Sequence, residues 1–414
     1  MTAPLKSNPL HIIGPGLLVA ATGVGAGDLA MGAFAGSTLG PAVLWAVVFG
    51  ALLKFVLSEG LARFQLATGE TLLAGALART PRPARYLFLL YLLPWSWFVG
   101  LALIRACGAT AQALLPLPGP GIEIWGALHS LLGLLLVWRG GFALFEKLMS
   151  LGVGIMFLTV IATAVALGFD AQEVMRGLLL PSASSFSGEG LTWTVGLIGG
   201  VGGTLTLLCY GYWIREEGRT QPEDLRTCRI DLAVGFTVTA IFGLAMVLIG
   251  SRVETSGQGS GLIVALAGEL ERELGTGARL AFLIGAWGAV FSSLLGVWQA
   301  VPFIFADFWR RVGRELPAPD EAPQQPAGKP YRLYMLALAI LPLAGFAVSF
   351  KQAQKAYGVV GAVFLPLLAI TLLWLNREAI VGKALANRWL SWLGLFVTLA
   401  FFLGAAGLKY LGSG

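Results

Sequence analysis

The sequence has little cysteine, little histidine and little charge. Its 414 residues include three cysteines, two histidines and only 12% charged residues, whereas soluble globular proteins carry about 25% charged residues. Because the cysteines and histidines are few and scattered, a disulfide framework and a zinc cluster of the usual spacing are excluded. The scarcity of charge excludes a soluble multidomain enzyme.

Hydrophobic sequence is abundant: 57% of the residues are hydrophobic, and the mean hydropathy is +0.78. Apolar runs bounded by charged residues, proline or glycine predict eleven membrane-spanning helices. The runs cover residues 12–36, 41–66, 86–108, 122–138, 148–168, 191–214, 230–250, 279–306, 333–350, 357–375 and 389–408. They are too long and too uniformly apolar for barrel strands. We therefore expect an all-α polytopic membrane protein, with residues 1–414 forming one transmembrane domain.

Loop charges predict the orientation of the chain in the cell (inner) membrane. With the N-terminus in the cytoplasm, eighteen of the 28 lysines and arginines fall in cytoplasmic loops and seven in outer loops, and such a bias marks the cytoplasmic side. We expect the C-terminus outside, and we attribute the net charge of +6 to these loops rather than to a nucleic-acid partner. Residues 317–330 are rich in proline and predict a flexible cytoplasmic linker. The amphipathic stretch 262–274 is either a connector or a helix on the outer surface.

Alternating glycines interrupt the first predicted span. Gly23, Gly25 and Gly27 precede Asp28, and each glycine in a helix interior costs about 1 kcal/mol relative to alanine. The helix is expected to open here, and the freed backbone groups then need a substrate or water as partner. A carboxylate inside the membrane is a functional candidate by default.

The sixth span carries a matching feature. Gly199, Gly200, Gly202 and Gly203 precede Thr204. Two glycine-interrupted spans in corresponding positions are typical of inverted-repeat transporters, whose broken helices meet at the midplane and line the substrate site. The alternative is that the glycines only allow close helix packing.

Four further charged residues lie inside predicted spans. Glu59 and Arg63 are four residues apart, which favours an intrahelical ion pair. Lys54 has no partner at helical spacing and could pair with Asp28 or another carboxylate. Arg105 must reach the interface, pair, or face an aqueous cavity, so both structural pairing and a transport role stay open for it.

The first two spans resemble those of the Nramp family of proton-coupled divalent-metal transporters. GPGLLVAATGVGAGDLAMGAFAGSTLGPAVLW is similar to the family's first span, LARFQLATGETL to the end of its second, and TVGLIGGVGGTLTLL more weakly to its sixth. The resemblance implies the LeuT fold, with broken helices 1 and 6. It also implies two inverted five-helix repeats over about 10–168 and 188–376, followed by an extra helix over about 388–410.

The sequence departs from the family where the metal ligands are expected. Residues 25–28 read Gly-Ala-Gly-Asp where the family has Asp-Pro-Gly-Asn, and residues 203–205 read Gly-Thr-Leu where it has Met-Pro-His. The thioether and imidazole are therefore missing. The family's acidic residues of the proton path align with Ala102 and Arg105, which makes proton coupling doubtful.

These residues define a predicted substrate site and a substrate class. A carboxylate, backbone carbonyls and a hydroxyl suit a hard, partly hydrated divalent cation such as Mg²⁺ better than a soft transition metal. We expect a secondary transporter that moves such an ion by alternating access. The predicted site consists of Gly25, Ala26, Gly27, Asp28, Gly200, Gly203 and Thr204, with Asp28 as the metal ligand and with Arg105, Lys54 and Glu59 as candidate coupling or gating residues.

Other functions stay open at this stage. Glycine-rich breaks also present free N–H groups, so a small anion or zwitterion bound with the help of Arg105 is the alternative substrate, and a non-transporting family member is a further one. A channel lacks a recognisable selectivity filter. A membrane enzyme lacks a nucleophile or ligand cluster, and no cofactor is expected. The expected partners are the small ion and the lipid bilayer, and the oligomeric state stays open.

Overall fold

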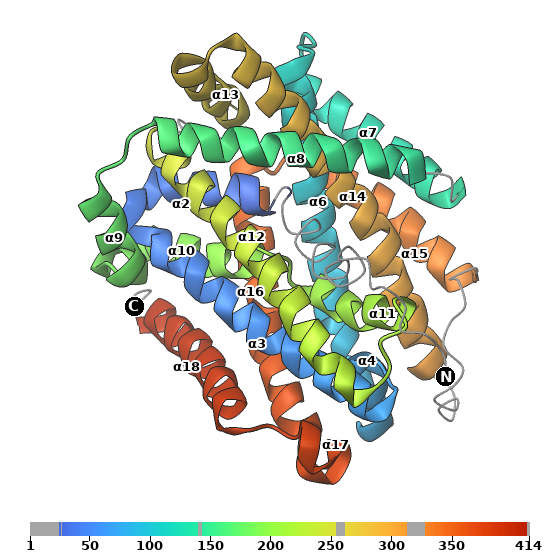
Figure 1. The fold of residues 1–414 in the computed structure, drawn as a ribbon. Helices are drawn as coiled ribbons and strands as arrows, with labels where there is room; N and C mark the ends of the chain where they lie inside the picture. Colours follow the sequence, from blue (N-terminus) through green and yellow to red (C-terminus); the bar gives the residue numbers. More distant parts are fainter. Residues whose placement is uncertain (1–24, 26, 140–142, 254–260, 313–327, 412–414) are drawn as a thin grey trace, which may run out of the picture.

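The computed structural model describes residues 25, 27–139, 143–253, 261–312 and 328–411, and over these residues the chain is helical and contains no strand (Figure 1). The helices as far as the middle of the chain are η1 (Gly27–Met31), α2 (Gly32–Leu39), η2 (Gly40–Val43), α3 (Leu44–Thr68), α4 (Leu72–Arg79), α5 (Arg82–Arg85), α6 (Leu87–Leu114), α7 (Gly121–Arg139), α8 (Ala143–Ala166), α9 (Ala171–Leu179) and η3 (Ala183–Phe186). Those that follow are α10 (Gly188–Gly200), η4 (Leu205–Leu208), α11 (Cys209–Glu216), η5 (Pro222–Asp224), α12 (Leu225–Ser251), α13 (Leu262–Leu274), α14 (Thr276–Val312), α15 (Lys329–Ile340), η6 (Leu341–Gly345), α16 (Phe350–Leu375), α17 (Glu378–Leu385) and α18 (Trp389–Leu411).

Length and composition mark eight segments of the described chain as able to cross a membrane, or nine if the bent pair Val153–Ala166 and Ala171–Phe186 is one span. The sequence predicted eleven spans, and the difference from eight or nine has two physical reasons. One of the eight, Gly27–Thr68, has 42 residues and would be about 63 Å long as a straight helix, twice the thickness of the hydrocarbon core. It therefore contains parts of the first two predicted spans. The ninth predicted span is split between α15, which has 12 residues, and the short η6.

Burial places the sixth span at the centre of the molecule and the last helix at its edge. In the most apolar stretch of Gly188–Glu216, 89% of the residues are buried, against 22% for Trp389–Tyr410. Figure 1 shows α10 inside the bundle, whereas α18 lies outside α3 and α16. A helix that is apolar on all sides yet exposed suits a lipid-facing position.

Small residues bring α10 and α16 unusually close together. A Cβ atom at Gly358 would lie 2.7 Å from the carbonyl oxygen of Gly196, and one at Gly199 would lie 2.7 Å from the Cβ of Ala362. Contacts of this kind are how membrane helices pack in the absence of a hydrophobic driving force. The central half-helix is thereby fixed against α16.

The connecting segments test two predictions about loops. The stretch 262–274 forms the helix α13, which packs on α14 and α8. Most of the predicted linker 317–330 lies outside the described residues, and its end was wrong: Lys329 and Pro330 begin α15, because proline is favoured in a first helical turn. The extra helix expected over 388–410 is α18.

Candidate functional site

The predicted break in the sixth span is present. Helix α10 ends at Gly200, and helical structure resumes at Leu205. Between them Gly202 and Gly203 have φ angles of 75° and 79°, a conformation that residues with a Cβ rarely adopt. The alternative that these glycines serve packing alone is wrong for Gly202 and Gly203, because both adopt the positive φ angles that break the helix.

The first span meets this break through its own glycines. Gly25 lies in a turn, and helical structure begins as a π-helix at Gly27. A Cβ atom at Gly27 would lie 2.6 Å from the carbonyl oxygen of Gly200, so only glycine permits this approach. Gly25 lies directly against Ser293 of α14. Ala26, a predicted site residue, lies outside the described residues, as does Gly23.

Asp28 lies where the two spans meet and is fully buried. Its Oδ1 accepts a hydrogen bond of 2.8 Å from the backbone N–H of Gly202. Its Oδ2 has no hydrogen-bond partner within the part of the chain that is described. The carboxylate also lies in the first turn of its helix, where the helix dipole favours negative charge. Within the described residues, one oxygen of Asp28 is therefore held in place and the other has no partner.

Lys54 reaches the same point from α3. It is fully buried, and its Nζ donates hydrogen bonds to the carbonyl oxygens of Gly199, at 3.1 Å, and of Val201. Its positive charge is attracted to the Asp28 carboxylate. The predicted relation to Asp28 is thus electrostatic, while the hydrogen bonds of Lys54 go to main-chain oxygens.

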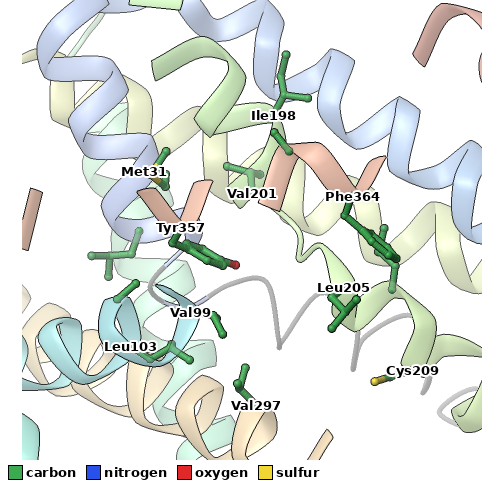
Figure 2. Close-up of a cluster of buried hydrophobic side chains, with 14 of the residues drawn as sticks. Met31, Val99, Leu103, Ile198, Val201, Leu205, Cys209, Val297, Tyr357 and Phe364 are labelled. Atoms are coloured by element: carbon green, nitrogen blue, oxygen red, sulfur yellow. The ribbon is translucent and has the colours of Figure 1, made fainter. Parts of the chain in front are cut away.

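Thr204 closes the break on the side of α6. Its Oγ1 accepts a hydrogen bond of 3.0 Å from Nε1 of Trp95, and its methyl group lies against Gly361, where a Cβ atom would be 2.8 Å away. Figure 2 shows Tyr357, which extends from α16, with Val201 next to it in this view, while Leu205 lies nearer to Phe364.

Two residues at this site were not predicted. Trp95 bonds to Thr204, and a Cβ atom at Gly27 would lie 3.6 Å from the Tyr357 ring. Both residues are aromatic and lie in apolar runs, where nothing in the pattern separates them from core residues. The one property that could have marked them is their polar atom, since a buried indole N–H or phenol O–H needs a hydrogen-bond partner.

Arg105 and Glu59 lie in other polar clusters. Arg105 forms a 2.6 Å ion pair with Glu123 at the start of α7, donates to the carbonyl oxygen of Phe346, and has its guanidinium 5.3 Å from the Phe346 ring centroid. Structural pairing, one of the two options for Arg105, is what the structure shows.

Glu59 pairs with Arg63 at 2.8 Å, as its helical spacing predicts, and also with Arg229 of α12 at 2.7 Å. Arg63 in turn donates to the carbonyl oxygen of Leu385 and to Asn387. Glu59 ties α3 to α12, and Arg63 ties α3 to the end of α17 and the residues that follow it. The partners of Glu59 are not those of Asp28.

An interrupted helix that meets a neighbouring span around a buried carboxylate is typical of one class of membrane proteins, the transporters with discontinuous spans. The chain belongs to the Nramp family: the family model described as natural resistance-associated macrophage protein-like matches residues 16–409. A relative from Acidiphilium cryptum, named divalent metal cation transporter MntH, is 25% identical over 400 residues, which cover 92% of this chain and 86% of that protein.

Solved structures agree on the fold. A manganese transporter of Eremococcus coleocola, in complex with an aromatic bis-isothiourea compound, has a TM-score of 0.73 and 18% identity, with 99% of this chain and 88% of that chain covered. MhsT in complex with L-phenylalanine has a TM-score of 0.62 and 16% identity, with 98% and 99% covered. The chain is therefore a multi-pass membrane protein with the LeuT fold, as expected from its resemblance.

Proposed function

We propose that this protein carries a divalent metal cation across the cell membrane by alternating access, with Asp28 as the ligand that binds the ion. The observation that carries the proposal is the Asp28 carboxylate, buried where the first span meets the break of the sixth, with one oxygen free of partners among the described residues. Family membership and a relative named as a divalent metal cation transporter support the substrate class.

The donors around Asp28 favour a hard or partly hydrated ion such as Mg²⁺. Carboxylate, carbonyl and hydroxyl oxygens surround the break, and the described residues contain no cluster of three His, Cys, Asp or Glu side chains that could hold a metal. Mg²⁺ releases its water reluctantly and is often bound through one or two carboxylates. Soft transition metals prefer sulfur and imidazole ligands, which these glycine-rich breaks do not supply.

An anionic substrate is disfavoured by the position of Arg105. Its guanidinium contacts the Glu123 carboxylate and a backbone carbonyl, so its charge is balanced where it lies. The remaining cation, Lys54, donates to carbonyl oxygens and is attracted to Asp28. The free oxygen at the site is an acceptor, which suits a cation.

The transport cycle that we propose uses the two halves of the fold. The repeats over about 10–168 and 188–376 would move relative to each other, with spans one, two, six and seven as the moving bundle and with the extra helix 388–410 outside it. The N-terminus would lie in the cytoplasm and the C-terminus outside. Such rocking around a fixed site at the breaks is the usual behaviour of inverted-repeat transporters.

Ion uptake into liposomes tests the proposal. The wild-type chain should take up Mg²⁺ in a saturable manner, and Asp28→Asn should lower the rate at least about tenfold, because an interaction with a charged ligand is worth more than the 1.4 kcal/mol that a factor of ten requires. Glu378→Gln, which changes an exposed carboxylate on α17, serves as the matched control. Size-exclusion chromatography checks that each variant is folded.

Three results would contradict parts of the proposal. Equal uptake by the wild type and Asp28→Asn would remove Asp28 as the ligand. A flux that does not saturate would indicate a channel. High-affinity uptake of Mn²⁺ without uptake of Mg²⁺ would overturn the preference for a hard ion.

A further inference from the structure

Lys54 differs from three other buried cations of the described residues in what it contacts. Arg63, Arg105 and Arg219 each contact a carboxylate oxygen, at 2.8, 2.6 and 2.8 Å respectively. Both hydrogen bonds of Lys54 end on main-chain carbonyl oxygens, 145 and 147 residues away in the sequence. The ammonium of Lys54 thus has surroundings that resemble those of a bound cation.

The two carbonyl groups belong to the broken end of α10. The last four carbonyls of a helix have no partner within the helix, and the helix dipole makes that end negative. Gly199 lies in the last turn of α10, and Val201 directly follows the helix. An opening in a membrane helix leaves such groups for a bound ion or water to satisfy. Here a side chain of the protein satisfies them.

The same turn connects Lys54 with Asp28. Val201 accepts from Lys54, and the next residue, Gly202, donates its N–H to Asp28. The Val201 carbonyl and the Gly202 N–H belong to one trans peptide unit, in which the two groups point in opposite directions. This single peptide therefore serves both charges. One carboxylate and one ammonium, both fully buried, leave the site without net charge when no ion is bound.

We propose that Lys54 is a tethered cation that fills part of the ion site in the empty transporter. A divalent ion must displace this ammonium from the carbonyls of the break. Lys54 thereby lowers the affinity for the ion, because the ion competes with it. It also lets the empty transporter change conformation, because the buried Asp28 carboxylate keeps a balancing charge. The inference rests on the proposed function and specifies how the same site controls affinity and net movement.

The experiment compares Lys54→Met with the wild type. Methionine keeps a similar length and removes the charge. Lys383→Met, which makes the same change on the exposed surface of α17, is the matched control. Calorimetric titration of the full chain in detergent with MgCl₂ and MnCl₂ measures affinity. Liposomes containing no divalent ion and liposomes preloaded with it measure net uptake and exchange.

Lys54→Met should bind the divalent ion about tenfold more tightly or better, because a positive charge has been removed from the site. Its net uptake should fall relative to its exchange by a similar factor, because an unbalanced carboxylate hinders the return of the empty transporter. Lys383→Met should match the wild type in both assays.

Several outcomes would overturn the inference. Unchanged or weaker binding by folded Lys54→Met, with a wild type that binds the ion, refutes the tethered cation and leaves the proposed function intact. An unchanged ratio of net uptake to exchange refutes its part in the return step. Failure of both the wild type and Lys54→Met to bind or carry any divalent ion overturns the proposed function itself.

Folding of the variants gives an independent measurement. If Lys54→Met does not fold, the charge-balanced pair Asp28→Asn with Lys54→Met should fold, since it leaves no buried unpaired charge. If the double variant folds, the result supports charge balance between Asp28 and Lys54. If the double variant also fails to fold, Lys54 is a structural brace for the carbonyls and the inference is wrong.

Discussion

The close contact between α10 and α16 gives a quantitative prediction for Gly199→Ala. The added Cβ would lie 2.7 Å from both the Cβ and the backbone nitrogen of Ala362, and closer still to the carbonyl oxygen of Gly358. Ordinary contacts between carbon atoms are about 3.5–4.0 Å. Two of the three neighbours are main-chain atoms of α16, so no flexible side chain can move aside. Either the helices separate or the backbone distorts.

The expected cost follows from measured overpacking. Inserting a methyl group into a well-packed core costs about 1–3 kcal/mol, while replacing glycine by alanine in a helix gains up to about 1 kcal/mol. Gly404→Ala supplies the reference, because a Cβ atom at Gly404 of α18 meets nothing within 4 Å. The gain in helix propensity from replacing glycine by alanine is common to both variants. Gly199→Ala should therefore be about 1–3 kcal/mol less stable than Gly404→Ala.

Denaturant unfolding in detergent measures this difference. The fluorescence of the 13 tryptophans reports the transition, and the free energies of unfolding of the two variants are compared directly. Equal stability, or a more stable Gly199→Ala, would show that α10 and α16 do not approach as closely as described. In that case the position of the break at Gly200 relative to α16 would also be in question.

Two further predictions concern the polar clusters outside the proposed ion site. Glu59→Gln should lower the free energy of unfolding by about 2–3 kcal/mol, because Arg63, only 3% exposed, loses its charged partner. The control is Glu70→Gln, whose partner Arg79 is 33% exposed. It should lower the free energy of unfolding by less than about 1 kcal/mol in the same assay. Arg105→Gln should destabilise the chain, because it leaves Glu123 unpaired, yet leave the affinity for Mg²⁺ in calorimetry within about twofold. A large loss of affinity without a loss of stability would place Arg105 in the ion site.

The parts of the fold that follow from local chemistry could be predicted from the sequence. Hydropathy identified the helical class, because a chain in lipid must satisfy its backbone groups within helices. The break near Gly202 and Gly203 could be predicted because these glycines cluster ahead of Thr204 in a span that is otherwise apolar. The buried position of Asp28 could be predicted because a carboxylate within a membrane span is costly and almost always faces the protein interior.

The partners of the buried charges could not be predicted, because they depend on tertiary contacts. Lys54 bonds to carbonyls, and every residue has a carbonyl, so no residue type marks the acceptor. The second partner of Glu59 is Arg229, which lies 170 residues further along the chain. The helical spacing of Glu59 and Arg63 predicted only one of the two ion pairs of Glu59. The partner of Arg105, Glu123, lies across a turn between two helices, beyond any helical spacing.

One departure of this chain from its family moves the carboxylate of the break. The family pattern is Asp-Pro-Gly-Asn where residues 25–28 read Gly-Ala-Gly-Asp, so the single acid is Asp28 instead of the residue at position 25, and Lys54 is buried in the same region. The described site holds one acidic and one basic side chain, whose charges cancel, and a bound divalent ion would raise its net charge to that of the ion in a medium of low dielectric constant. The ion must then keep water, or displace the ammonium, to lower that cost. Weak binding of a partly hydrated ion is the expected result, and it follows from the charge count independently of any ligand preference.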